Sequence, residues 1–152
     1  MAVIDNGPTI PAVSLYQPWA TAMALKIKKN ETRHWPTDIR GWLAIHAAKR
    51  PVDREGRLLA TAAGLNGLLV FGCFVCIVRI VGCEKTELLK RLGVSDQEQG
   101  WGNYADGRWA WVTSPNDLIE IPKPIPFIGH QGIFRWVPPA WLQDRMRENK
   151  RS

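Results

Sequence analysis

The chain has 152 residues, the size of one domain, with 45 % hydrophobic and only 22 % charged residues. This composition is typical of a folded protein and excludes an intrinsically disordered one. The formal net charge of +6 favours anionic partners such as nucleic acid or nucleotides, although a basic surface without any partner explains the charge equally well.

No targeting or membrane segment is expected. The first residues lack a basic stretch followed by an apolar one, which a signal peptide would have. The most apolar stretch, residues 68–83, is interrupted by Arg79 and falls short of a membrane span. We therefore expect a cytoplasmic protein. Its three cysteines are an odd number and argue against a disulfide framework.

Hydrophobic periodicity and turn residues divide the chain into short strands and helices. Trp19, Met23 and Ile27 recur at four-residue spacing, which predicts the buried face of a helix. Residues 93–107 are rich in glycine and polar residues and predict a long loop. The predicted elements are, in chain order, a strand at 13–16, a helix from 17 to the lysines at 26–29, an extended segment at 30–35, a strand at 42–48, a helix at 52–63, a long strand at 68–82, a helix at 86–92, strands at 108–113, 118–121 and 133–137, and a helix from 138 onward.

Six or seven short strands with a few helices predict an α+β fold. We expect a small mixed β-barrel flanked by helices, in a single domain that spans residues 1–152. Residues 1–12 and 145–152 are expected to form flexible tails.

Cysteine and histidine patterns point away from metal and redox chemistry. Cys73 and Cys76 lie three positions apart on a predicted strand, so they point to opposite faces, and buried structural thiols are favoured. His34, His46 and His130 are far apart and have no flanking ligand pattern. We expect no metal and no cofactor. For His46, packing in the core or at its rim is favoured over catalysis.

The stretch LKIKKNETRHW at residues 25–35 concentrates charge beside aromatic residues. A lysine such as Lys28 suits a phosphate or a proton transfer, whereas the planar fork of Arg33 suits bidentate contacts or stacking on a base. Glu31 can orient both cations. Taken alone, these residues favour an ion pair that closes the barrel, and a ligand site is the alternative.

Several stretches together resemble the ASCH domain, a branch of the PUA-like superfamily. They are SLYQPWATAM, then Lys28-x-x-Glu31-x-Arg33, then RGWLAIHAAKR, GRWAWVT and PIPFIGHQGIFRW, and they cover nearly the whole chain. The resemblance implies a β-barrel flanked by helices, with a cleft that binds RNA or nucleotides. The family signature G-x-K-x-x-E-x-R maps onto Lys28, Glu31 and Arg33, with Lys26 in place of the glycine.

The resemblance also implies two possible hydrolytic activities in the same cleft. One is a metal-independent ribonuclease. The other is an amidohydrolase of N4-acetylcytidine, in which a threonine three positions after the signature lysine is the nucleophile. Glu31 stands at that position here. In a hydrolase, Lys28 would be the general base or electrostatic stabiliser, and Glu31 would orient water or protonate a leaving group.

The candidate site residues have two kinds of role. Lys28 and Glu31 are the catalytic candidates, and the side chains expected to contact a ligand are Gln17, Trp19, Arg33, Trp35, His46, Tyr104 and Arg108. Tyr104 and Arg108 are placed on the opposite wall of the cleft. The eight tryptophans could stack on bases, although core packing is favoured for each one taken singly.

Three functions therefore remain open. The first is binding of RNA, a nucleotide or a modified nucleoside, the second is hydrolysis in the same cleft, and the third is a non-catalytic protein-interaction module with a structural ion pair. The sequence leaves the oligomeric state open.

Overall fold

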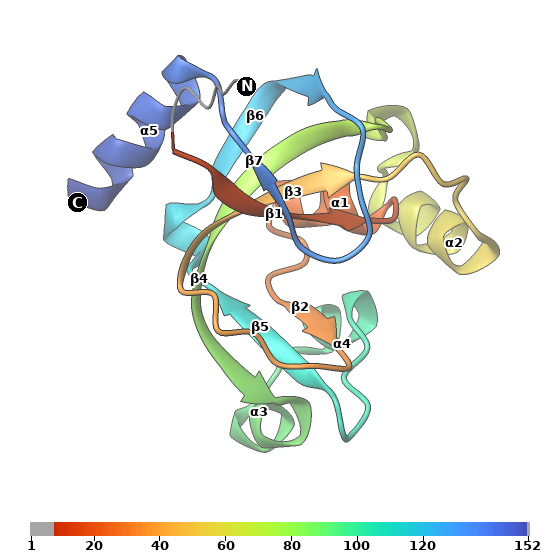
Figure 1. Cartoon of the computed structure of the whole chain (residues 1–152). Helices are drawn as coiled ribbons and strands as arrows, with labels where there is room; N and C mark the ends of the chain where they lie inside the picture. The colour runs from red at the N-terminus through yellow and green to blue at the C-terminus, as the bar shows by residue number, and fades with distance from the viewer. Residues whose placement is uncertain (1–7, 152) are drawn as a thin grey trace.

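The computed structural model describes residues 8–151 of the chain, which form one curled mixed sheet with five α-helices around it (Figure 1). Within that range, no helix is both long and apolar enough to cross a membrane. The elements are β1 Ile10–Leu15, α1 Trp19–Ala24, β2 Glu31–Arg33, β3 Gly41–Ala47, α2 Arg54–Ala63, a 3-10 turn Asn66–Leu68, β4 Cys73–Lys85, α3 Thr86–Leu92, α4 Asp96–Trp101, β5 Trp109–Thr113, a 3-10 turn Pro115–Asp117, β6 Ile119–Pro126, β7 Phe134–Trp136 and α5 Ala140–Arg151.

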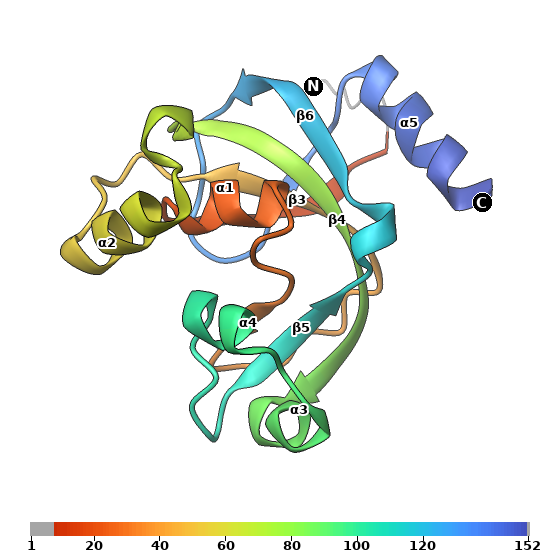
Figure 2. The same cartoon turned by 180° about the vertical axis from the view of Figure 1, so that it is seen from behind.

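The sheet has seven strands in the order β2-β5-β4-β3-β1-β7, and β6 pairs separately with β4. Only β1 and β3 run parallel among these pairs. The 13-residue strand β4 pairs with three neighbours, and register shifts along it accompany its bend. It curls the sheet into a half-barrel, with α1 lying inside the curve (Figure 2).

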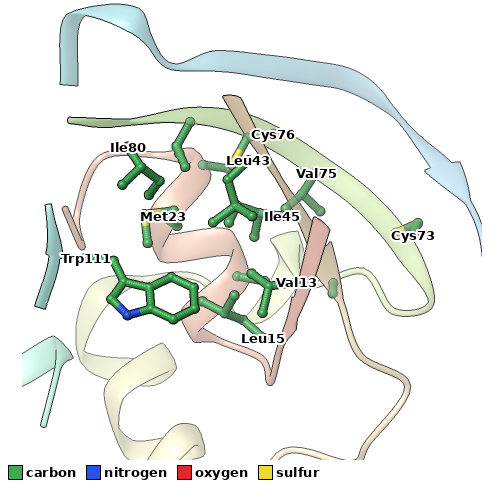
Figure 3. Close-up of a cluster of buried hydrophobic side chains, with 14 residues drawn as sticks. Val13, Leu15, Met23, Leu43, Ile45, Cys73, Val75, Cys76, Ile80 and Trp111 are labelled. Carbon is green, nitrogen blue, oxygen red and sulfur yellow. The ribbon is translucent and has the colours of Figure 1, made fainter. Parts of the chain in front are cut away.

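Both faces of the central strands are buried, which explains the nearly continuous apolar run in β4. One core cluster fills the inside of the curve, and Figure 3 shows the ring of Trp111 pointing into it. A second cluster lies on the outer face. Strand β4 contributes to both sides: Phe74 and Ile77 belong to the outer cluster, whereas Val75 and Val78 belong to the inner one. Cys73 and Cys76 are both buried in the inner cluster as free thiols, so the prediction that they point to opposite faces is wrong. The register shift between Phe74 and Cys76 breaks the alternation of faces that a regular strand would have.

The predicted fold class is confirmed, but several boundaries differ from expectation. The predicted loop at 93–107 contains α4, because the Ser95 hydroxyl accepts the Glu98 N–H and caps this helix. Helix α1 ends at Ala24, before the lysines, since Lys26 takes a left-handed conformation with φ of 63°. The long strand begins at Cys73 rather than residue 68.

The two expected tails are also shorter or more regular than predicted. Residues 10–12 pair with β7 on one side of β1, and β3 on the other side pairs with Ala12. Residues 145–151 are helical in α5. Residues 8 and 9 have no regular secondary structure, and residues 1–7 and 152 of the expected tails lie outside the described residues.

Candidate functional site

Three charged side chains meet at the start of β2. The Glu31 carboxylate lies between two cations, 3.4 Å from Lys28 Nζ and 2.6 Å from Arg33 Nε. Lys28 is only 2 % exposed and also donates to the Asn30 carbonyl. Because each buried charge has a partner, the cluster avoids the cost of an isolated buried ion. It carries one net positive charge, and Arg33 is its most exposed member.

The turn before β2 places Lys28 in this cluster. The N–H groups of Ile27 and Lys28 both donate to the Ala22 carbonyl, so the chain folds back over the end of α1. Lys26, in the left-handed conformation, makes this reversal. It stands where the signature has glycine, the residue that adopts such a φ without steric cost. Lys26 therefore takes a backbone conformation that suits the glycine of the signature.

A second buried carboxylate holds the same turn in place. Glu98 on α4 accepts the Lys29 N–H at 2.7 Å, the Asn30 N–H at 3.0 Å and the Tyr104 hydroxyl at 2.7 Å. Burial, followed by the hydrogen bond to Glu98, raises the pKa of Tyr104, so its hydroxyl remains a donor. Tyr104 is buried and supports the site from behind.

Arg33 connects the two sides of the half-barrel. Its Nη2 donates to the Ser14 carbonyl on β1 at 3.4 Å, across the open side of the sheet. Its guanidinium lies 5.9 Å from the ring centroid of Trp35 and 5.8 Å from that of Trp111. Trp111 is buried, whereas Trp35 is 48 % exposed. An exposed ring and a partly exposed cation are thus side by side.

The predicted residues Gln17 and Trp19 have internal roles. Gln17 is 1 % exposed, and its Nε2 donates to Thr21 Oγ1 and to the Val70 carbonyl, each at 2.8 Å. Its Oε1 accepts the Thr21 N–H, so the amide is used within the fold. Trp19 is half-buried and packs against the inner core.

His46 lies among residues of the outer core. Its ring packs edge-on to Phe74, a member of that cluster, at a centroid distance of 5.2 Å. Its Nε2 is 2.7 Å from the Phe127 carbonyl, and its Nδ1 is 3.0 Å from Ser14 Oγ. The carbonyl can only accept, so the neutral ring donates from Nε2 and accepts the serine hydroxyl at Nδ1. Burial lowers the pKa of His46 and favours this neutral form.

Arg108 lies at the rim of the site rather than on an opposite wall. It donates to the Thr32 carbonyl of β2 and to the Asn103 carbonyl, both at 3.1 Å. Its guanidinium also contacts the ring of His34. Of the predicted residues, the structure therefore brings together Lys28, Glu31, Arg33 and Trp35, supports them with Tyr104 and flanks them with Arg108.

The sequence did not point to Tyr16, Arg50 or Glu98. Tyr16 is 50 % exposed, and the Arg50 guanidinium lies 4.3 Å from its ring centroid. Tyr16 comes two residues after Ser14, whose carbonyl Arg33 contacts. Only its place in the SLYQPW stretch could have drawn attention to it.

The buried part of the cluster leaves little space for a ligand. The pocket beside Lys28 holds about 10 Å³, room for about one water molecule. No side-chain hydroxyl or thiol within residues 8–151 hydrogen-bonds to Lys28, Glu31 or Arg33. The same residues contain no group of three or more His, Cys, Asp or Glu side chains that could hold a metal ion. The accessible groups are therefore Arg33 and the exposed rings.

Comparison with models of protein families shows to which family the chain belongs. The model of the ASCH domain matches residues 13–118, more than half of the chain. The chain belongs to the ASCH domain family. The match includes the residues Lys28, Glu31 and Arg33 that carry the resemblance in the sequence, so that resemblance is confirmed.

Solved structures show the same fold at low identity. The crystal structure of ASCH from Zymomonas mobilis is 16 % identical, with a TM-score of 0.52 over 91 % of this chain and 93 % of that one. A tyrosine-to-phenylalanine variant of the Zymomonas protein gives 16 % identity and a TM-score of 0.51, over 88 % of this chain and 94 % of that one. The serine-to-alanine variant of the Zymomonas protein is 17 % identical to this chain, with a TM-score of 0.51 over 91 % of this chain and 94 % of that one. No curated protein matches the sequence.

Proposed function

We propose that this ASCH domain binds RNA or a nucleotide at the surface formed by Arg33, Trp35, Tyr16 and Arg50, here called the Arg33 site. The observation that carries the proposal is the placement of Arg33. Glu31 holds its Nε at 2.6 Å, while a ring that is 48 % exposed lies beside it. An oriented guanidinium next to an exposed aromatic ring suits a phosphate and a base together.

Each group has a separate task in this site. The Nη1 of Arg33 makes no hydrogen bond within the described residues, so it remains for a phosphate or a base edge. Trp35 and Tyr16 offer rings on which bases can stack. Lys28 and Glu31 form the buried floor of the site. Glu31 orients Arg33, and Lys28 balances the charge of Glu31, so the three side chains together keep one net positive charge. The net charge of +6 favours the approach of an anionic strand.

Fluorescence anisotropy with a labelled 12-nucleotide single-stranded RNA tests the proposal. Trp35→Leu should weaken binding about 5- to 150-fold, from about 1–3 kcal/mol per stacked base. Arg33→Lys should also weaken it, because the charge remains but the planar fork is lost. Trp141→Leu is the matched control, since Trp141 is 45 % exposed on α5, and it should bind like wild type. Unchanged affinity in both site variants would reject the proposal.

The same protein should be incubated with RNA and with N4-acetylcytidine, and the products separated by chromatography. Turnover that disappears in Lys28→Met would assign a hydrolase to the site. This variant keeps an aliphatic side chain in the buried position, and Lys90→Met, which removes an exposed ion pair with Asp106, is its control. RNA affinity that does not respond to any site variant, together with no turnover, would instead favour a protein-interaction module.

A further inference from the structure

An open groove of about 810 Å³ lies on the surface where β1, β3 and β4 begin or bend. Its charged lining residues are Arg40, Arg79 and Arg135, and Trp42 on β3 also lines it. No acidic residue is among the described residues that line it. We call the surface formed by Arg40, Trp42, Arg79 and Arg135 the arginine groove. A concave surface with three guanidinium groups is built for an anion.

Arg79 has the least satisfied side chain in the groove. Its guanidinium lies 4.3 Å from the ring centroid of Trp42, which holds its plane in place. Asp117 forms an ion pair with Nε at 3.3 Å, but Nε and Nη2 are buried without a hydrogen bond. The side chain is still 23 % exposed. Arg79 is therefore oriented by stacking and charge, with most of its hydrogen-bonding capacity unused within the described residues.

The other two arginines of the groove donate hydrogen bonds to uncharged oxygens, which orient their side chains without neutralising their charge. Arg40 donates from Nη1 to the carbonyls of Thr37 and Ile39, at 3.1 and 2.8 Å. Arg135 donates to the hydroxyl and carbonyl of Thr9, at 3.0 and 2.9 Å. Neither has a carboxylate partner within residues 8–151. Among the described residues, Asp117 is the one carboxylate that forms an ion pair with any of the three arginines, so two of the three guanidinium groups have no carboxylate partner.

The chain itself connects this groove with the Arg33 site. The segment between β2 and β3 starts beside Trp35 and ends at Ile39 and Arg40, which line the groove. Figure 1 shows this segment running alongside β5 before it enters β3. A strand bound at one end of this segment can therefore follow it to the other end. A single nucleotide at the Arg33 site would leave the groove empty.

We propose that the arginine groove binds the backbone phosphates of an RNA strand whose bases are held at the Arg33 site. This inference rests on the proposed function and deepens it, because it makes the ligand an extended strand rather than a free nucleoside. Guanidinium groups bind phosphate oxygens in a bidentate manner, and a strand presents phosphates in series. Each phosphate contact should also add to the salt dependence of binding.

The test compares the 12-nucleotide RNA with uridine monophosphate in the Arg40→Gln/Arg135→Gln double variant. Both side chains are exposed and bond mainly to backbone carbonyls, so the fold should persist, whereas Arg79→Ala would also remove the stacking on Trp42. We expect weaker RNA binding and a plot of log K against log salt that is shallower by about 1.4, from about 0.7 per lost phosphate contact on a single strand. Affinity for uridine monophosphate should not change.

The matched control is Arg54→Gln/Arg57→Gln on α2. It removes the same net charge from two exposed arginines, and Arg57 likewise bonds to a backbone carbonyl. It should retain the wild-type salt slope. Equal RNA affinity and slope in the two double variants would overturn the proposal. Loss of inorganic phosphate binding, with RNA binding intact, would also overturn it and make the groove a free-phosphate site. Trp35→Leu tests the Arg33 site separately, so the failure of one proposal can be told from that of the other.

Discussion

At the scale of single residues, Lys26 shows how a departure from the family signature is accommodated. A residue with a β-carbon in the left-handed region costs roughly 1–2 kcal/mol, and this cost falls on the turn that positions Lys28. The Lys26 side chain is exposed, so it can leave the turn without a clash. The signature lysine, glutamate and arginine then meet as expected.

Lys26→Gly should therefore raise the free energy of unfolding, by about 0.5–1 kcal/mol after the greater freedom of glycine in the unfolded chain is subtracted. Lys26→Val should lower it, since β-branched residues tolerate positive φ poorly. Urea denaturation measures both. Lys29→Gly is the control. Lys29 lies three residues further along the same turn at negative φ, so its replacement by glycine should be destabilising. If the Gly variants at 26 and 29 behave alike, the strain at Lys26 is not significant.

His46 makes the stability of the domain depend on pH. Burial lowers the pKa of His46 in the folded state, while the ring in the unfolded chain has a pKa of about 6.5. As pH falls from about 7.5 to 5.5, the unfolded state takes up the proton more readily, so the free energy of unfolding decreases. Stability from this group is present above the unfolded pKa and is lost on acidification.

His46→Gln should flatten that dependence, because glutamine can still donate to the Phe127 carbonyl but does not titrate. Urea denaturation at pH 7.5, 6.5 and 5.5, in wild type and variant, measures the difference. His34 and His130 remain in both proteins, so their contributions are shared. Parallel pH curves would show that His46 has an ordinary pKa.

At the scale of elements, α4 is the support of the site. Glu98 alone accepts two backbone N–H groups of the 28–30 turn and one tyrosine hydroxyl. In Figure 2, α4 lies beside the segment that leads into β2. The position of the Arg33 site thus depends on a helix that forms no hydrogen bond or ion pair with Arg33 within the described residues.

Glu98→Ala should lower the free energy of unfolding by about 2–4 kcal/mol, because it leaves buried donors without an acceptor for bonds of about 1.5–3 kcal/mol each. It should also weaken RNA binding, since the turn before β2 loses its anchor. Tyr104→Phe removes one of the bonds and should have a smaller effect on both. The exposed Glu148→Ala on α5 is the control. A Glu98→Ala protein as stable as this control would contradict the assigned role.

Comparison of these elements with the sequence shows where local patterns suffice. The apolar strands, α2 and the Lys28, Glu31 and Arg33 cluster followed from periodicity, caps and the family signature. Glu98 did not, because its partners are 68 and 69 residues away, and no local pattern records such a contact. Helix α4 was missed because its glycine and polar residues favour a loop, whereas the Ser95 cap and the buried Trp101 stabilise a helix.

Exposure was equally hard to predict. Gln17 and Trp35 can both donate hydrogen bonds and both lie near the signature in the sequence, but Gln17 is 1 % exposed and Trp35 is 48 % exposed. The difference arises from tertiary packing: the Val70 carbonyl lies over Gln17, whereas Trp35 lies at the edge of the sheet beyond β2. Such distinctions decide which candidate side chains can reach a ligand.

At the scale of the whole molecule, the two main cores share the same strands. Val13, Leu43 and Val75 point into the inner cluster, and their neighbours Ala12, Ala44 and Phe74 belong to the outer one. Loss of β1, β3 or β4 would therefore expose both clusters at once. This arrangement makes the chain one folding unit although its core lies on two sides of a sheet.

We therefore expect one cooperative unfolding transition. Tryptophan fluorescence reports on both sides, since Trp111 lies in the inner cluster and Trp136 in the outer one. The urea midpoint from fluorescence should coincide with the midpoint from far-ultraviolet circular dichroism. Two separated transitions would show that the clusters unfold independently.

The central claim, that RNA binds at the Arg33 site, is tested most directly by amide chemical-shift mapping. Nitrogen-15-labelled protein would be titrated with the 12-nucleotide RNA and its amide and indole signals followed. We predict that the largest shifts occur at residues 14–16 and 31–35, together with the indole of Trp35. Shifts confined to other parts of the molecule, or none at saturating RNA, would contradict the account.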